Sequence, residues 1–189
     1  CSTDCEGGSL EVFDNVNRIV KDDLAVTIEK GSRISIAAAC FSIYAYQVLK
    51  DQLNNIEELR FIFTSPAFVK EKASKEKREF YIPRLNRERS LYGTEFEVKL
   101  RNELTQKAIA RECTTWIRQK ASFKSNTTGR SMDSLVDVDC GGSGYSYTPV
   151  NEFTTTDLGC EQGNHITNSV IKMTHAESAQ LLDSFEQVW

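Results

Sequence analysis

Hydrophobic positions in the first third of the chain follow two periods in turn, and these predict alternating helices and strands. Leu10 to Lys30 has helical spacing, and Gly31 is a suitable residue to end that helix. The apolar run from Arg33 to Cys40 predicts a buried strand, and Ser42 is suited to cap the helix that follows. Glu58 to Thr64 alternates as a second strand. This order, with short links, indicates an α/β domain whose sheet begins with parallel strands.

The second half of the chain predicts one long helix followed by short strands. Thr94 to Lys120 carries an apolar stripe with helical spacing, and Thr174 begins a final helix. Between them, β-prone segments occupy 122–124, 134–138, 145–150 and 165–171, with a hairpin turn at Gly141 to Gly144. We expect an α/β sandwich with a mixed, mostly parallel sheet and helices on both faces. Residues 10–189 are expected to form this one domain, after a disordered or vector-derived stretch at 1–9.

Charge is distributed unevenly along a chain whose net charge is only −4. From Lys70 to Arg130 there are 16 Lys and Arg residues against 8 Asp and Glu, whereas the remainder has 7 against 19. Arginines and aromatics are interleaved in this segment, a combination that suits phosphate contacts and base stacking. The alternative interpretation is a solvated helix face with internal ion pairs. We assign nucleic-acid binding to Arg84, Arg87, Arg89, Arg101, Lys124 and Arg130.

Composition places the chain among ordinary globular proteins, with 40% hydrophobic and 26% charged residues. No run of residues is apolar enough to predict a membrane span, and no signal sequence is found, so we expect a cytoplasmic protein without a membrane partner. None of the six cysteines lies in a C-x-x-C pair, which favours reduced thiols. Because the chain begins at Cys1 without a methionine and stops abruptly at Trp189, we expect it to be a piece of a longer protein.

Few residues offer catalytic chemistry. The chain has two histidines, His165 and His175, and neither lies in a recognised nucleophile or zinc-binding motif. Asp133, Asp137 and Asp139 alternate, so their carboxylates are expected on one side of a strand. An exposed polar face is favoured there over a site for a divalent ion. We therefore predict no catalytic residue, no metal and no cofactor in this domain.

Several segments together resemble a known family. Ile34 to Tyr46, followed by Glu58 to Pro66, resembles the opening of the phospholipase-D-like domains of bacterial Snf-type superfamily-two helicases. Lys107 to Lys120, with Cys-Thr-Thr-Trp inside it, is similar to their long helix, and Glu152 to Gly159 to their late Asn-Phe-Thr…Leu-Gly segment. The similarity extends over nearly the whole chain from about Phe13. It implies a phospholipase-D-like fold.

The catalytic signature of that family is His-x-Lys followed by Asp, in which the histidine attacks phosphorus and the lysine stabilises phosphate oxygens. No His-x-Lys occurs in this sequence. At the corresponding positions the resemblance puts Thr128 for the histidine, Arg130 for the lysine and Glu152 for a late asparagine. A threonine hydroxyl lacks the near-neutral pKa of imidazole and its readiness to form a phospho-intermediate. The resemblance thus implies a degenerate site that does not catalyse.

The implied function is that of a non-catalytic accessory domain of a helicase-type ATPase. It would bind DNA or RNA while a helicase motor domain in the parent chain hydrolyses ATP. One alternative is a dimerisation or assembly module without nucleic-acid affinity, because active relatives bring two half-sites together and a homodimer can outlast catalysis. The other is a nuclease with a rewired, metal-dependent site at Glu152 or at the three aspartates Asp133, Asp137 and Asp139.

Overall fold

The computed structural model describes residues 10–64, 103–161 and 168–189. Its centre is one sheet with the strand order β1-β7-β6-β5-β2-β3-β4. The strands are β1 (Glu11–Phe13), β2 (Arg33–Ala38), β3 (Glu58–Phe63), β4 (Ala121–Ser125), β5 (Leu135–Asp139), β6 (Gly144–Thr148) and β7 (Val170–Thr174). The helices are α1 (Val20–Thr27), α2 (Ile43–Val48), α3 (Lys50–Leu53), α6 (Glu103–Lys120) and α7 (Ala179–Val188).

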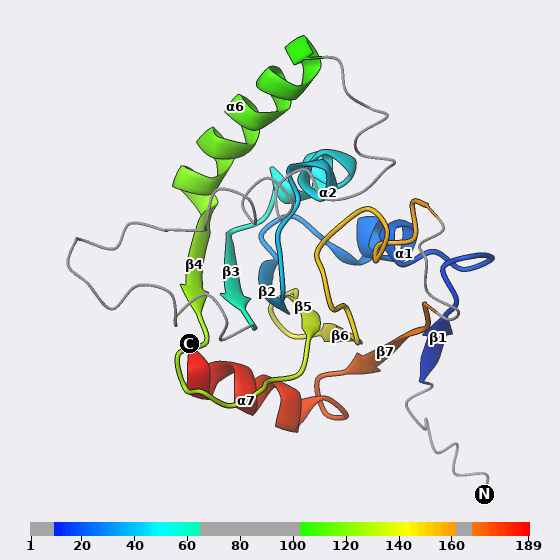
Figure 1. The fold of residues 1–189 in the computed structure, drawn as a ribbon. Helices are drawn as coiled ribbons and strands as arrows, with labels where there is room; N and C mark the ends of the chain where they lie inside the picture. Colours follow the sequence, from blue (N-terminus) through cyan, green and yellow to red (C-terminus); the bar gives the residue numbers. More distant parts are fainter. Residues whose placement is uncertain (1–9, 65–102, 162–167) are drawn as a thin grey trace, which may run out of the picture.

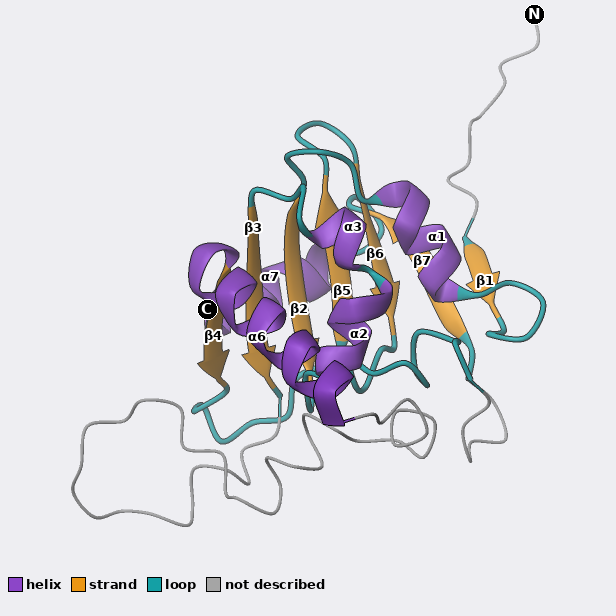
Figure 2. Ribbon diagram, turned by 90° about the horizontal axis from the view of Figure 1, so that it is seen from above, coloured by secondary structure: helices purple, strands orange, loops and turns teal. Residues whose placement is uncertain are grey.

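Helices cover both faces of this sheet, as expected for the α/β class (Figures 1 and 2). Figure 2 shows α1, α2, α3 and α6 on one face and α7 on the other. The larger layer of the core lies under the first four helices, and Phe61 and Trp116 are among its buried side chains. The smaller layer joins Phe185 of α7 to Ala37, Ile62 and Leu135 of the sheet. No helix in the described ranges is long and apolar enough to cross a membrane.

The directions of the strands divide the sheet into two parts. β2 pairs in parallel with β3, and β3 with β4, as the early part of the sequence predicts. From β5 to β1 every pairing is antiparallel, so the balance differs from the mostly parallel sheet that we expected. For β5 and β6 the physical reason is the short link between them. The tight turn in which Cys140 N–H donates to Ser143 O (2.9 Å) joins only antiparallel strands, whereas parallel strands need a crossover.

The segment from Leu10 to Lys30 also differs from its prediction, since it opens with strand β1 and a turn before α1 begins at Val20. Asp14 explains the interruption. Its Oδ1 accepts hydrogen bonds from three successive backbone N–H groups, the first from Val16 at 2.9 Å and the last from Arg18 at 3.0 Å. A short acidic side chain that binds the backbone in this way competes with helix formation. Apolar spacing alone did not reveal this competition.

Two other local predictions are confirmed, and the predicted start of the last helix is wrong. Ser42 caps α2, because its Oγ accepts a hydrogen bond from Tyr44 N–H at 3.1 Å. The glycines of the β5–β6 turn fit it, since Gly141 has a φ of 76°, in the left-handed region. The last helix begins at Ala179 instead of Thr174, which ends β7. The start predicted for the long helix, at Thr94, lies outside the described residues.

A cluster of phenylalanines fixes the loop after β6 to the end of β2. Phe153 stacks on Phe41 with ring centroids 5.4 Å apart, and Phe41 meets Phe61 edge-on at 5.6 Å. Backbone hydrogen bonds add to these contacts, from Phe153 N–H to Cys40 O and from Ser42 N–H to Phe153 O, both at 3.0 Å. The side chain of Phe153 is therefore the main anchor of the loop that carries Glu152.

We predict that Phe153→Ala lowers the free energy of unfolding by about 3 kcal/mol or more, because it removes a buried ring whose space cannot close fully. Urea denaturation followed by circular dichroism measures the change. Val26→Ala is the control, since Val26 is 81% exposed and its truncation is expected to change stability by less than about 0.5 kcal/mol. Equal effects of the two substitutions would contradict this account of the core.

Candidate functional site

The carboxyl ends of β2, β3 and β4 lie together at one end of the sheet (Figure 2). Thr64 N–H donates to Ala38 O at 3.0 Å, and Asn126 N–H donates to Phe63 O at 2.9 Å. Thr64 is the last residue described before the segment 65–102. Four residues assigned to nucleic-acid binding fall in that segment, outside the described residues: Arg84, Arg87, Arg89 and Arg101.

The loop after β4 carries Thr128 and Arg130 at this end of the sheet. Its organising residue is Asn126, which is fully buried. Asn126 Oδ1 accepts from Thr128 N–H at 3.0 Å and from its hydroxyl at 2.6 Å, and Asn126 Nδ2 donates to Arg130 O at 2.7 Å. The Arg130 side chain is exposed, and within the described residues it has no ion-pair partner. The loop thus presents a guanidinium group to solvent.

Glu152 comes to the same end of the sheet from the loop after β6. The two loops meet where Ser134 Oγ donates to Asn151 Oδ1 at 3.0 Å. Glu152 is exposed, and its backbone N–H donates to the buried Asp157 carboxylate at 2.8 Å. The three positions that the resemblance singles out, Thr128, Arg130 and Glu152, therefore belong to neighbouring loops. Neither histidine is described at this end of the sheet. His175 belongs to the turn between β7 and α7, and His165 is outside the described residues.

Lys124 has a different environment from Arg130. It lies opposite Ile62 in the β3–β4 register, and Ile62 belongs to the core layer under α7. The Lys124 ammonium group lies 4.3 Å from the centroid of the Trp189 ring and donates to the Trp189 carbonyl oxygen. Lys124 is nevertheless exposed. It adds positive charge along the edge strand β4, on the α7 face of the sheet.

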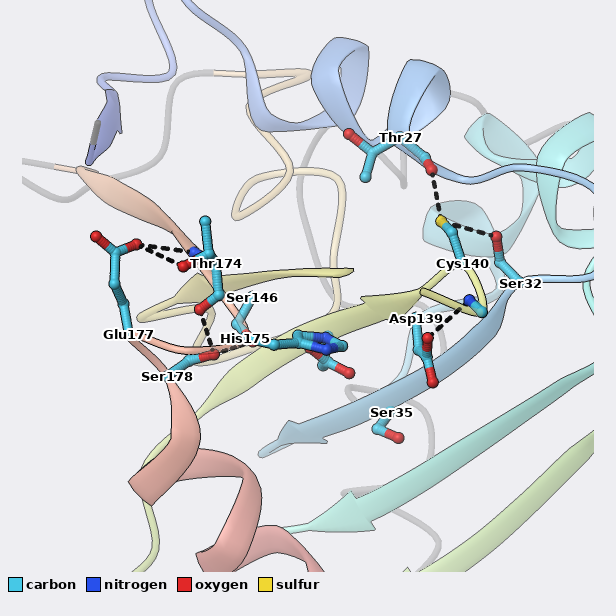
Figure 3. Close-up of polar contacts among 12 residues, drawn as sticks. Thr27, Ser32, Ser35, Asp139, Cys140, Ser146, Thr174, His175, Glu177 and Ser178 are labelled. Atoms are coloured by element: carbon cyan, nitrogen blue, oxygen red, sulfur yellow. Dashed lines mark hydrogen bonds and ion pairs between the residues drawn. The ribbon is translucent and has the colours of Figure 1, made fainter. Parts of the chain in front are cut away.

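A buried polar network centres on Asp137, in the middle of β5. Figure 3 labels three of the residues around it, Ser146, His175 and Ser178. One carboxylate oxygen, Oδ1, accepts from Ser146 Oγ at 2.7 Å and contacts His175 Nε2 at 2.9 Å. Ser146 Oγ also contacts Ser178 Oγ at 2.9 Å. His175 comes from the turn between β7 and α7, so this network ties α7 to the sheet. The imidazole lies against Gly144, where an added Cβ would come within 2.0 Å of the ring.

Burial is the main electrostatic influence on Asp137, which is 5% exposed. Desolvation raises the pKa of this carboxyl, although the Ser146 hydrogen bond and the nearby His175 oppose the shift. The expectation of an exposed face for the three aspartates is therefore wrong at Asp137, because the turn that carries His175 covers it. Asp133 is exposed and precedes β5, and Asp139 accepts from Gly141 N–H at 2.8 Å.

One contact in this network was not anticipated from sequence. The pairing of His175 with Asp137 joins residues 38 positions apart, and no local pattern signals it. No group of three or more His, Cys, Asp or Glu residues suited to a metal ion is found among the described residues. Cys113 and Cys140 are thiols, and burial raises the pKa of Cys113 to about 12, which suppresses its thiolate. The Cys140 thiol donates to Thr27 O at 3.4 Å.

No family model and no curated protein matches this sequence. Among solved structures, the chain is similar to two mutant forms of yeast tyrosyl-DNA phosphodiesterase, each with a TM-score of 0.43 and 14% sequence identity. Each alignment covers 88% of this chain, but only 30% of one enzyme chain and 31% of the other. This chain therefore spans about a third of the length of those enzymes.

We predict that Asp137→Asn stabilises the fold at about pH 8 relative to the wild type, and that the difference shrinks towards about pH 4. Asparagine keeps an acceptor for Ser146 but carries no charge that burial opposes. Because the pKa of Asp137 is raised in the folded state, the wild type loses stability as the pH rises through that pKa. Urea denaturation at both pH values measures the difference.

Asp183→Asn, on the exposed side of α7, is the matched control and should give little change at either pH. Destabilisation by Asp137→Asn that is greater at about pH 8 than at about pH 4 would contradict the stated role of burial.

Proposed function

We propose that this chain is a non-catalytic phospholipase-D-like domain that binds DNA or RNA as an accessory to a helicase-type ATPase in the same parent chain. The observation that carries the proposal is the position of the cations. Arg130 is exposed at the end of the sheet where β3 stops, and Thr64 precedes the part of the chain from Lys70 to Arg101, the basic segment, that holds four more of the assigned arginines. Positive charge that is concentrated in one part of a chain attracts phosphate even when the net charge is negative.

The chemistry of the degenerate positions supports binding without cleavage. The Thr128 hydroxyl donates to Asn126 Oδ1, and no general base contacts it in the described structure. A nucleophilic hydroxyl needs an adjacent base to remove its proton. His175 is bonded instead to the buried Asp137 on a face of the sheet. Arg130 can still bind a phosphate through its guanidinium group, which requires no proton transfer.

We predict that Arg84→Gln, Arg87→Gln and Arg89→Gln together weaken binding of a random-sequence oligonucleotide. The logarithm of the association constant should also fall less steeply with the logarithm of salt concentration, by roughly 2 to 3 units of slope. The reason is that a complex with fewer phosphate contacts releases fewer counterions when it forms. Fluorescence anisotropy over a KCl series measures both quantities.

A control variant with the same change in net charge is Arg18→Gln, Lys21→Gln and Lys30→Gln, which neutralises three cations in and beside α1. It should keep most of the wild-type affinity. The proposal is wrong for this segment if the arginine variant matches the wild type in affinity and salt slope. It is wrong for the domain if the wild type binds neither DNA nor RNA at low salt.

A further inference from the structure

Most cations in the described ranges have a partner, and the exceptions are concentrated on one helix. Arg18, Lys21, Arg33, Lys50, Arg60 and Lys172 form ion pairs with carboxylates, and Lys120 and Lys124 donate to backbone carbonyls. Lys30, Lys107, Arg111, Arg118 and Arg130 have neither kind of side-chain partner among the described residues. Three of these five, Lys107, Arg111 and Arg118, lie on α6.

These three cations share one face of α6. At about 100° per residue, they fall within about 40° of one another around the helix axis. The buried side chains Ile109 and Trp116 point in the opposite direction, and Trp116 Nε1 donates to Leu53 O at 2.9 Å. All three cations are exposed. The packing of α6 on the domain therefore turns this row of charges towards solvent, and we call it the α6 cationic stripe.

Among the described residues no ion pair neutralises the stripe, although Glu103 stands four residues before Lys107 on the same helix. Glu112 lies at its flank and is bonded to Lys50 of α3 at 2.6 Å. Thr114 and Thr115 lie between the cations, and their hydroxyls donate to the carbonyls of Ala110 and Arg111 at 2.7 and 3.0 Å. A helix stabilised by its own ion pairs would place carboxylates three or four residues from each cation. Here small neutral side chains fill the space next to Arg111 and Arg118.

We propose that the α6 cationic stripe of Lys107, Arg111 and Arg118 binds the phosphate backbone of a nucleic acid. From the first to the last of the three the helix rises about 16 Å, which matches roughly five phosphates along one strand of a duplex. The inference rests on the proposed function and extends it from the basic segment to a rigid helix. Because the contacts are with phosphates, binding is independent of base sequence.

The position of α6 fits this role. The helix follows the basic segment directly and belongs to the crossover that returns the chain from β3 to the parallel strand β4. Figure 1 shows α6 on the outside of the domain, with its amino-terminal end directed away from the sheet. The side of α6 that carries Ile109 and Trp116 is fixed in the core, so the opposite, charged face is held rigidly in position.

The test compares Lys107→Gln, Arg111→Gln and Arg118→Gln, made together, with the wild type and with the control variant at Arg18, Lys21 and Lys30. The probes are two unrelated random-sequence DNA oligonucleotides, each single- and double-stranded, and the readout is anisotropy over a KCl series. We expect the stripe variant to bind all probes about tenfold more weakly at low salt, with a salt slope smaller by roughly 2 to 3. Circular dichroism must show an unchanged fold.

The outcomes separate the two proposals. Wild-type binding that is unchanged in the stripe variant but weakened by the substitutions at Arg84, Arg87 and Arg89 overturns the stripe and leaves the proposed function standing. Absence of wild-type binding overturns both. Loss of binding for only one of the two oligonucleotide sequences also overturns the stripe, since phosphate contacts do not distinguish bases. An equal loss of affinity in the control variant would show that only the net charge matters, and this too would overturn the stripe.

Discussion

The central strand β2 is the constraint on which the rest of the described structure depends. Ile34, Ile36 and Ala38 are all almost fully buried, and the two neighbours of this strand run in opposite directions. On one side, parallel pairing with β3 and then β4 requires a long crossover that ends in α6. On the other side, antiparallel pairing permits short hairpins. The chain between β3 and β4 contains α6, Arg130 follows β4, and α7 covers the other face of the sheet.

Charges are handled differently on the two sides of β2. Towards β5 and β6, the buried Asp137 is compensated locally by Ser146 and His175, and these contacts hold the turn before α7. Towards β4, Arg130 and the α6 cationic stripe have no such compensation in the described residues. Exposed cations without a partner contribute little to stability. A role in binding therefore explains their presence better than a role in folding does. The His175 imidazole helps to fix the fold, and these exposed cations lie elsewhere in the described structure.

Sequence reasoning succeeded where a structure is determined locally. The strand at Arg33 follows from a mostly apolar run and the strand at Glu58 from alternation. The cap at Ser42 follows from the preference of a hydroxyl for the first turn of a helix. It failed where a side chain acts on the backbone or across the sheet. Asp14 interrupts the predicted first helix, and burial of Asp137 depends on a turn 38 residues away. The α6 cationic stripe was recognised only after Trp116 was found to point into the core, because this orientation shows which face of α6 points outward.

The most direct test of the account is to map where the wild-type chain touches a nucleic acid. Ultraviolet cross-linking to a random-sequence oligonucleotide at low salt, followed by mass spectrometry of the digested protein, locates the contacts. We predict cross-linked peptides from the region between Lys70 and Arg130, including α6, and none from α1 or α7. Absence of cross-links, or cross-links confined to α1 and α7, would contradict the claim that Arg130 and the α6 cationic stripe bind phosphate.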